Sequence, residues 1–142
     1  MTQSATTRRD TCIGSPLERI EDLRFLRGRG QYVDDLKRPG ALHAAVVRSA
    51  VARGRLRAID VAAALAMPGV RAVITAADLH GGVPLIPVRA EAQGTLDHVR
   101  QPVIAHERVR YVGEPVALVV ADRAAQAEDA ANAVDVDIEA SD

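Results

Sequence analysis

The residue types that most often hold metals or transfer protons are few in this chain and lie far apart. Its histidines are His43, His80, His98 and His106, and no two of them have the spacing of an HxH, HxxxH or HExxH metal site. Cys12 is the only cysteine, so the chain can form neither an internal disulfide nor an iron–sulfur cluster of its own. We therefore predict no metal site. His80 and His98 would be the least implausible ligands, because both fall in a segment without regular pattern.

Three acidic residues stand where a carboxylate could do chemistry. Glu114 lies between Gly113 and Pro115 in a tight turn, where it could transfer protons, accept backbone hydrogen bonds or pair with Arg110. The structural roles are favoured. Asp34 and Asp35 are adjacent, so on an extended segment they point to opposite faces and do not converge on one ion. We predict a capping or turn role for this pair.

The candidate nucleophiles and the one glycine-rich motif also favour structural roles. Ser15, Ser49 and Ser141 are candidates for a Ser–His–Asp triad only in principle, because the sequence has no GxSxG elbow. Cys12 is predicted to be an idle thiol, since no base or helix N-terminus is identified beside it. Residues 28–30 (Gly-Arg-Gly) follow no strand and precede no long helix, so we expect a turn into a short strand over residues 31–33 and not a nucleotide loop.

Length and composition restrict what these residues can belong to. A chain of 142 residues fits one domain, and its hydrophobic content of 48% is made largely of alanine and valine, with Phe25, Tyr32 and Tyr111 as the only aromatics. A net charge of −1 gives no general attraction to nucleic acid or membrane surfaces. No apolar run reaches the length of a membrane span and the N-terminus has no apolar signal region, so we expect a cytoplasmic protein.

The order of apolar runs and turn residues predicts the elements. Residues 1–12 are expected to form a disordered arm and residues 13–142 one domain, interrupted by a long irregular segment over 80–101. The recurrence of large apolar residues at three-residue spacing over 17–26 indicates either a helical turn or an irregular segment. Strands are expected at 42–47, 55–61, 70–75, 102–105, 116–121 and 134–140, and helical segments at 61–67, 76–79 and 123–133.

Two of these predictions concern helix starts, and one concerns the fold. Asp60 and Asp122 stand directly before the helices at 61–67 and 123–133, so each is expected to cap its helix. The run 116–121 is apolar throughout, which indicates a strand buried on both faces. The order strand–helix–strand occurs twice, so we predict an α/β (α+β) domain with short helices packed on a mixed sheet.

Two dense blocks, 19–49 and 109–140, resemble the opening domain of the large subunit of molybdenum hydroxylases, the family of xanthine dehydrogenase, aldehyde oxidase and aerobic carbon monoxide dehydrogenase. The resemblance is strongest to the carbon monoxide dehydrogenase-like branch. After Ser49 the family usually has a proline and an Ala-His-Ala-Arg run, which this sequence replaces with Ala-Val-Ala-Arg-Gly-Arg, so the substrate class stays open. The matching motifs are Ile-Gly-Ser-Pro at 13–16, Arg-Ile-Glu-Asp at 19–22, Arg-Phe-Leu at 24–26, Gly28, Tyr-Val-Asp-Asp at 32–35, the stretches 39–49 and 59–70, and Tyr-Val-Gly-Glu-Pro-Val-Ala at 111–117.

The resemblance implies an α/β-hammerhead domain that packs on a molybdopterin-binding remainder of the large subunit. In the family, iron–sulfur and FAD modules are partners, and the catalytic and pterin-binding residues lie in later sequence. The resemblance therefore assigns no catalytic, cofactor-binding or metal-binding residue to this chain, and it implies a scaffold and assembly role without activity of the chain alone. Two alternatives stay open: a free-standing binding module on the same fold, and an independent small enzyme.

Overall fold

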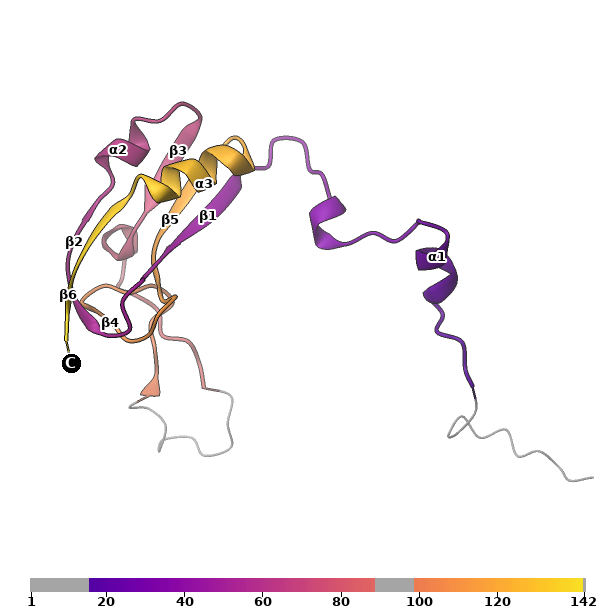
Figure 1. Cartoon of the computed structure of the whole chain (residues 1–142), viewed down its shortest axis with the longest axis horizontal. Coiled ribbons are helices and arrows are strands. Elements are labelled where there is room, and N and C mark those ends of the chain that lie inside the picture. Colours follow the sequence, from indigo (N-terminus) through magenta and orange to yellow (C-terminus); the bar gives the residue numbers. More distant parts are fainter. Residues whose placement is uncertain (1–15, 89–98, 142) are drawn as a thin grey trace, which may run out of the picture. The chain divides into compact units, whose positions relative to one another are not determined.

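The computed structural model describes residues 16–88 and 99–141, and the chain divides into two compact units, Met1–Pro39 and Gly40–Asp142 (Figure 1). The predicted arm over residues 1–12 lies outside the described residues, as do residues 89–98 of the predicted irregular segment. None of the helices in the described ranges has the length and apolar character that crossing a bilayer requires.

Within the first unit, a short helix α1 (Asp22–Leu26) and a single 3-10 turn η1 (Val33–Asp35) are the regular elements of the described part. The helical alternative is therefore confirmed for part of the 17–26 pattern. The expected short strand at 31–33 is wrong, because the Asp35 carboxylate accepts a hydrogen bond from the Tyr32 backbone N–H at 3.0 Å and closes the chain into a turn. The predicted turn role of the acidic pair is confirmed through Asp35.

In the second unit, two three-stranded antiparallel sheets have the strand orders β1-β5-β3 and β4-β2-β6. Two helices and one 3-10 turn connect the strands. The elements in chain order are β1 (His43–Arg48), β2 (Gly54–Asp60), α2 (Ala62–Leu65), β3 (Val70–Ile74), η2 (Ala76–Asp78), β4 (Arg108–Val109), β5 (Pro115–Ala121), α3 (Ala124–Asn132) and β6 (Asp135–Ala140).

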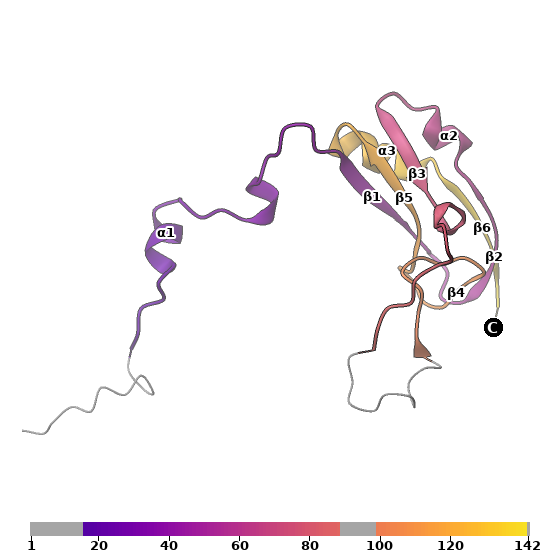
Figure 2. The ribbon, with the colours of Figure 1, turned by 180° about the vertical axis from the view of Figure 1, so that it is seen from behind.

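Helix α3 covers one face of the β1-β5-β3 sheet, as the opposite views in Figures 1 and 2 show. Strand β5 lies at the centre of that sheet, and Val116, Ala117, Val119 and Ala121 in it are fully buried. The predicted strand is confirmed, but its burial on both faces is only partial, because Leu118 and Val120 on the face away from α3 are half-buried. Alanines on α3 face this core, and Ala130 is buried in the same cluster as Val119. Small side chains let the helix lie close to the sheet, and each of them contributes little burial.

On the opposite face of the β1-β5-β3 sheet, no helix of the described ranges is packed (Figure 2). Leu118 on the central strand is paired with Val46 of β1 on one side and with Ile74 of β3 on the other. Because cross-strand partners share a face of the sheet, these three side chains lie together on this side. Val46 is exposed, and Leu118 and Ile74 are half-buried. This outer face is apolar and is only partly covered by the described residues.

The predicted α/β class is confirmed, but the strands form two antiparallel sheets where one mixed sheet was expected. The strand–helix–strand units β2-α2-β3 and β5-α3-β6 each begin in one sheet and end in the other. The connection 61–69 is shorter than the roughly a dozen residues that a parallel crossover needs, so β2 and β3 cannot become parallel neighbours. Instead, β3 pairs with β5 and β2 pairs with β6, both antiparallel, and these pairings join the two strand–helix–strand segments to each other.

Two local predictions are corrected and one is confirmed. The strand expected at 102–105 is absent from the described structure, where Pro102 makes only an isolated bridge to Leu85, because proline has no N–H to extend a ladder. Asp60 accepts a hydrogen bond from the Ala62 N–H at 2.9 Å and so caps α2 as predicted. Asp122 does not cap α3, because the Arg71 guanidinium binds its carboxylate at 2.8 and 2.9 Å.

Candidate functional site

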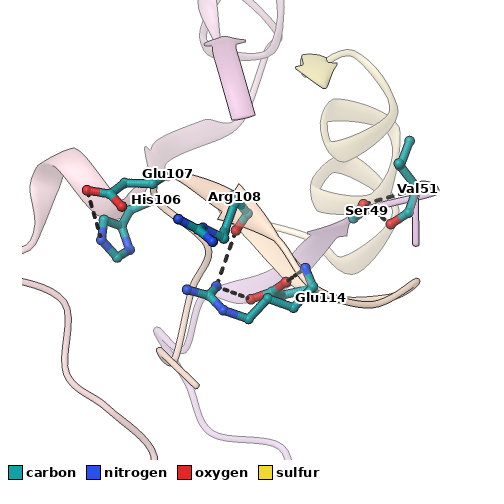
Figure 3. Close-up of polar contacts among 7 residues, drawn as sticks. Ser49, Val51, His106, Glu107, Arg108 and Glu114 are labelled. Carbon is teal, nitrogen blue, oxygen red and sulfur yellow. Dashed lines mark hydrogen bonds and ion pairs between the residues drawn. The ribbon is translucent and has the colours of Figure 1, made fainter. Parts of the chain in front are cut away.

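Glu114 is the only charged side chain that is fully buried in the described residues 16–88 and 99–141. It follows Gly113, whose φ of 90° allows the tight turn between β4 and β5. One carboxylate oxygen accepts a hydrogen bond from the Arg110 backbone N–H, and the other lies 3.0 Å from the Arg110 guanidinium. The same guanidinium donates to the Arg108 carbonyl at 3.2 Å (Figure 3). The predicted pairing of Glu114 with Arg110 is confirmed.

A proton-transfer role needs access to a substrate, and the surroundings of Glu114 give none. Its side chain is 0% exposed, and both oxygens are engaged by the turn that precedes it. Buried carboxylates are costly unless they are paired and hydrogen-bonded, and this one is both. The arrangement supports a structural role: the Glu114 carboxylate fixes the turn over residues 110–114.

Ser49 joins this turn to the end of β1. Its N–H donates to the Glu114 carbonyl at 2.9 Å, and its own carbonyl accepts from the Gly113 N–H at 2.8 Å. The Ser49 hydroxyl donates to the Val51 carbonyl at 2.8 Å and accepts from the Val51 N–H at 3.0 Å (Figure 3). No histidine of the described residues hydrogen-bonds this hydroxyl. Ser49 is therefore a turn residue and has no partner of a catalytic triad there.

The histidines do not converge within the described part of the chain. His43 is exposed at the start of β1, and the His80 Nδ1 lies 3.0 Å from the Asp78 carbonyl. His106 lies 4.0 Å from the Glu107 carboxylate (Figure 3). Residues 16–88 and 99–141 contain no group of three potential metal-ligating side chains, whereas Cys12, Ser15 and His98 lie outside them. The prediction of a chain without catalytic, cofactor-binding or metal-binding residues stays a prediction.

An arginine-lined groove of about 780 Å³ lies over the β4-β2-β6 sheet. The antiparallel register places Arg55 of β2 directly opposite Arg108 of β4. Neither guanidinium has a hydrogen bond or ion pair with the described residues, and like charges directly across a ladder destabilise it. Arg57 pairs with Glu139 on the neighbouring strand. The charged side chains that line the groove are Arg53, Arg55, Arg108, Glu107 and Glu139, and His106 also lines it.

Paired arginines of this kind suit oxyanions. Guanidinium groups bind carboxylates and phosphates through two parallel hydrogen bonds, and an anion between Arg55 and Arg108 would offset their mutual repulsion. Sequence reasoning did not find this groove. The alternating Arg53, Arg55 and Arg57 were a visible signal, but only the strand register shows that Arg108 faces the middle one.

The ion pair between Arg71 and Asp122 joins β3 to the end of β5 and is exposed. Hydrogen bonds from the Arg71 guanidinium hold the pKa of the Asp122 carboxyl below its usual value, and the charges of Arg71 and Arg123 act in the same direction. The carboxylate raises the pKa of Arg71 in turn. This pair is a surface contact between strands and does not adjoin the groove-lining residues.

Comparison with known proteins shows which family has this fold. Residues 27–142 match the model of the aldehyde oxidase and xanthine dehydrogenase a/b hammerhead domain. The chain is 44% identical over 127 residues to the nicotine 6-hydroxylase large subunit of Paenarthrobacter nicotinovorans, which covers 89% of this chain and 15% of that protein. It is 43% identical over 127 residues to the carbon monoxide dehydrogenase large chain of Afipia carboxidovorans, with the same two coverages.

A solved structure agrees with these relatives. The quinoline 2-oxidoreductase of Pseudomonas putida 86 matches with a TM-score of 0.77 and 39% identity, over 94% of this chain and 17% of that chain. This chain thus spans about one seventh of the length of the two large subunits that it matches and shares its fold with a domain of a solved oxidoreductase. It belongs to the aldehyde oxidase and xanthine dehydrogenase family of molybdenum hydroxylase large subunits, as its α/β hammerhead domain.

Proposed function

We propose that this domain serves in scaffolding and assembly, packing on the molybdopterin-binding part of a large subunit, and that the domain alone is inactive. The observation that carries the proposal is the match of nearly the whole chain to a small share of much longer large subunits. The buried polar groups support it, because Glu114 and Ser49 are both engaged in holding turns. A cytoplasmic location and partner modules carrying iron–sulfur clusters and FAD are parts of the same proposal.

The outer face of the β1-β5-β3 sheet gives the proposal a physical basis. Val46, Leu118 and Ile74 form an apolar surface that no helix of residues 16–88 and 99–141 covers. Burial of such a surface against another part of a large subunit contributes about 25 cal/mol per Å² of apolar area. A domain with a small alanine and valine core gains a large share of its stability from such a contact.

The described residues do not fit the molybdenum cofactor as a ligand of this chain. An iron–sulfur cluster needs more thiolates than the single Cys12 offers. The one buried side-chain atom without a hydrogen-bond partner in the described residues is the Gln126 Oε1, and the Gln126 amide packs closely against Gly69. The described residues contain no buried group of unpaired polar atoms that could hold the cofactor. We therefore assign no residue to the cofactor and derive no chemical step through it.

Domain exchange tests the proposal. In the carbon monoxide dehydrogenase large chain of Afipia carboxidovorans, the matching 127 residues would be replaced by this chain. We expect the exchanged large chain to be recovered in assembled enzyme that contains molybdenum and oxidises carbon monoxide, while the isolated domain binds no molybdenum and oxidises nothing. A folded isolated domain whose exchanged large chain never assembles would overturn the proposal.

The arginine-lined groove supports a second candidate, a free-standing module that binds an anionic ligand. The direct opposition of Arg55 and Arg108 favours it. A module of this kind would show a higher melting temperature with inorganic phosphate or citrate, and the Arg55→Gln variant would lose the shift. A melting temperature that stays constant in both anions counts against the module and leaves the assembly role.

A further inference from the structure

The N-terminal segment, residues 16–39, presents large apolar side chains that the described residues of its own unit do not bury. No residue of this segment is buried. Ile20 is 99% exposed and Leu26 is 84% exposed, and the other exposed members are Leu17, Leu23, Tyr32, Val33 and Leu36. Contiguous exposed apolar residues at this density mark an interaction surface in a soluble domain. Leu17, Ile20, Leu23 and Leu26 recur at three-residue spacing, and the described residues of their own unit form no buried core for them to face.

The segment nevertheless has its own local structure. The Phe25 and Tyr32 rings stack with centroids 5.7 Å apart and an interplanar angle of 17°. The Arg24 guanidinium lies 5.3 Å from the Phe25 ring centroid and pairs with Glu21 at 3.0 Å. Gly30 makes room for the ring, because a Cβ there would lie 2.6 Å from Phe25. The aromatic side chains therefore hold α1 and the following turn together, and Leu23 and Leu26 take no part in this stack.

The second half of the segment is organised in the same way. The hydrogen bond from the Tyr32 N–H to Asp35 and the bond of 3.1 Å from the Leu36 N–H to the Val33 carbonyl close the turn η1. Val33 and Leu36 are both exposed on this turn. A helix of five residues and one 3-10 turn are too short to be stable in water alone. Burial of their apolar side chains against a partner surface would supply the stability that this short helix and turn lack on their own.

We propose that the N-terminal segment docks on the part of the large subunit that lies beyond the hammerhead domain, and that Ile20, Leu23 and Leu26 are its anchors. This inference rests on the proposed function and names the surface that performs it. The relatives have about six sevenths of their length outside the match, so in those large subunits a large further part of the same polypeptide is available as a partner.

The reach of the matches supports this choice of partner. The family model begins at residue 27, whereas the two large subunits match over 127 residues, more than residues 27–142 contain. Their similarity therefore extends into α1 or the residues before it. The match to quinoline 2-oxidoreductase covers 94% of this chain and leaves too few residues to omit the whole N-terminal segment. The exposed leucines thus belong to a stretch that large subunits share, and a partner within the large subunit explains that best.

The test uses the exchanged carbon monoxide dehydrogenase large chain described above. One variant combines Ile20→Ser, Leu23→Ser and Leu26→Ser. The control combines Leu65→Ser and Leu85→Ser, two leucines of the second unit that are also exposed, though less so than Ile20 and Leu26, at 49% and 52%. We expect the triple variant to lower the yield of molybdenum-containing enzyme at least tenfold, and the control to keep it within twofold. The isolated triple variant should keep the melting temperature of the unsubstituted chain.

The outcomes distinguish a failure of this inference from a failure of the proposed function. If the unsubstituted exchange does not assemble, the proposed function fails. If it assembles and the triple variant assembles equally well, the docking role of the N-terminal segment fails alone. In the assembled enzyme without the triple substitution, a photo-crosslinking residue at position 23 identifies what the N-terminal segment contacts. A crosslinked peptide from the large chain outside the exchanged stretch supports the proposal, and one from another subunit or a second copy of this chain overturns it.

Discussion

The N-terminal segment and the unit Gly40–Asp142 both carry large apolar residues at regular spacing, and they use them differently. In the second unit, Val47, Val119 and Val134 turn toward one cluster under α3. In the N-terminal segment the leucines have no such cluster, and an aromatic stack alone gives local order. The difference shows that regular apolar spacing alone does not decide whether residues join a core, and we propose that in the N-terminal segment it serves an interface. Variants that affect one region and spare the other test this contrast.

The largest effect is expected at the buried carboxylate of the second unit. Glu114→Ala removes a fully buried carboxylate and leaves the Arg110 N–H and guanidinium without that acceptor, so the free energy of unfolding should fall by about 3 kcal/mol. Urea unfolding of the full chain, followed by circular dichroism, measures it. Glu107→Ala, whose side chain is largely exposed, serves as the control and should leave the midpoint unchanged. An equal loss in both variants would show that the turn over residues 110–114 depends on the local net charge and not on the hydrogen bonds of the Glu114 carboxylate.

A pair of matched valines compares the two regions directly. Val119 is fully buried at the centre of β5, and Val33 is 82% exposed in the N-terminal segment. Val119→Ala removes two buried methyl groups and should lower the free energy of unfolding by about 2 kcal/mol. Val33→Ala should leave it unchanged. Differential scanning calorimetry of both variants checks this, and a matching loss in Val33→Ala would mean that the N-terminal segment shares the core.

Much of the second unit could be predicted because its signals are local. The apolar run of β5 and the alternation of β6 give strands within a residue or two of those observed, and α2 lies within the helical segment expected at 61–67. Partner choice was not predictable, since it depends on residues far apart in the chain. Asp122 has the sequence position of a helix cap, and only the fold brings Arg71, 51 residues away, to its carboxylate.

The candidate site shows the same division. The pairing of Glu114 with Arg110 could be predicted because four residues and a glycine turn join them. The opposition of Arg55 and Arg108 could not, since it follows from the register of two strands that are distant in sequence. The exposure of Leu23 and Leu26 could not be predicted either. A three-residue apolar spacing is the same for a buried helix and for a docking segment, and only the surrounding chain decides between them.

A smaller effect is expected at the surface pair of Arg71 and Asp122. Hydrogen bonds from Arg71 lower the pKa of Asp122 in the folded state, so the pair stabilises the fold above the unfolded-state pKa, about 3.9 for an aspartate. That contribution is lost as the pH falls through the lower folded-state pKa. Arg71→Gln should therefore be less stable than the unsubstituted chain at neutral pH, and the gap should close in acid. Melting temperatures measured from pH 7 to pH 2 check this, with Arg53→Gln, which removes a charge but no ion pair among the described residues, as the control for charge alone.

The smallest effect on stability, and the sharpest test of local order, is expected at Gly30. Gly30→Ala places a methyl group 2.6 Å from the Phe25 ring, which must leave its stack with Tyr32. Phe25 is the only phenylalanine, so its NMR contacts with Tyr32 can be assigned without ambiguity and should vanish in the variant. The unfolding midpoint should stay constant, because no core residue depends on that stack. Gln31→Ala, at an exposed neighbouring position, should keep the ring contacts. Ring contacts that survive in Gly30→Ala would show that the stack does not order the segment, and the anchors of the proposed docking surface would then lack a fixed arrangement before they meet their partner.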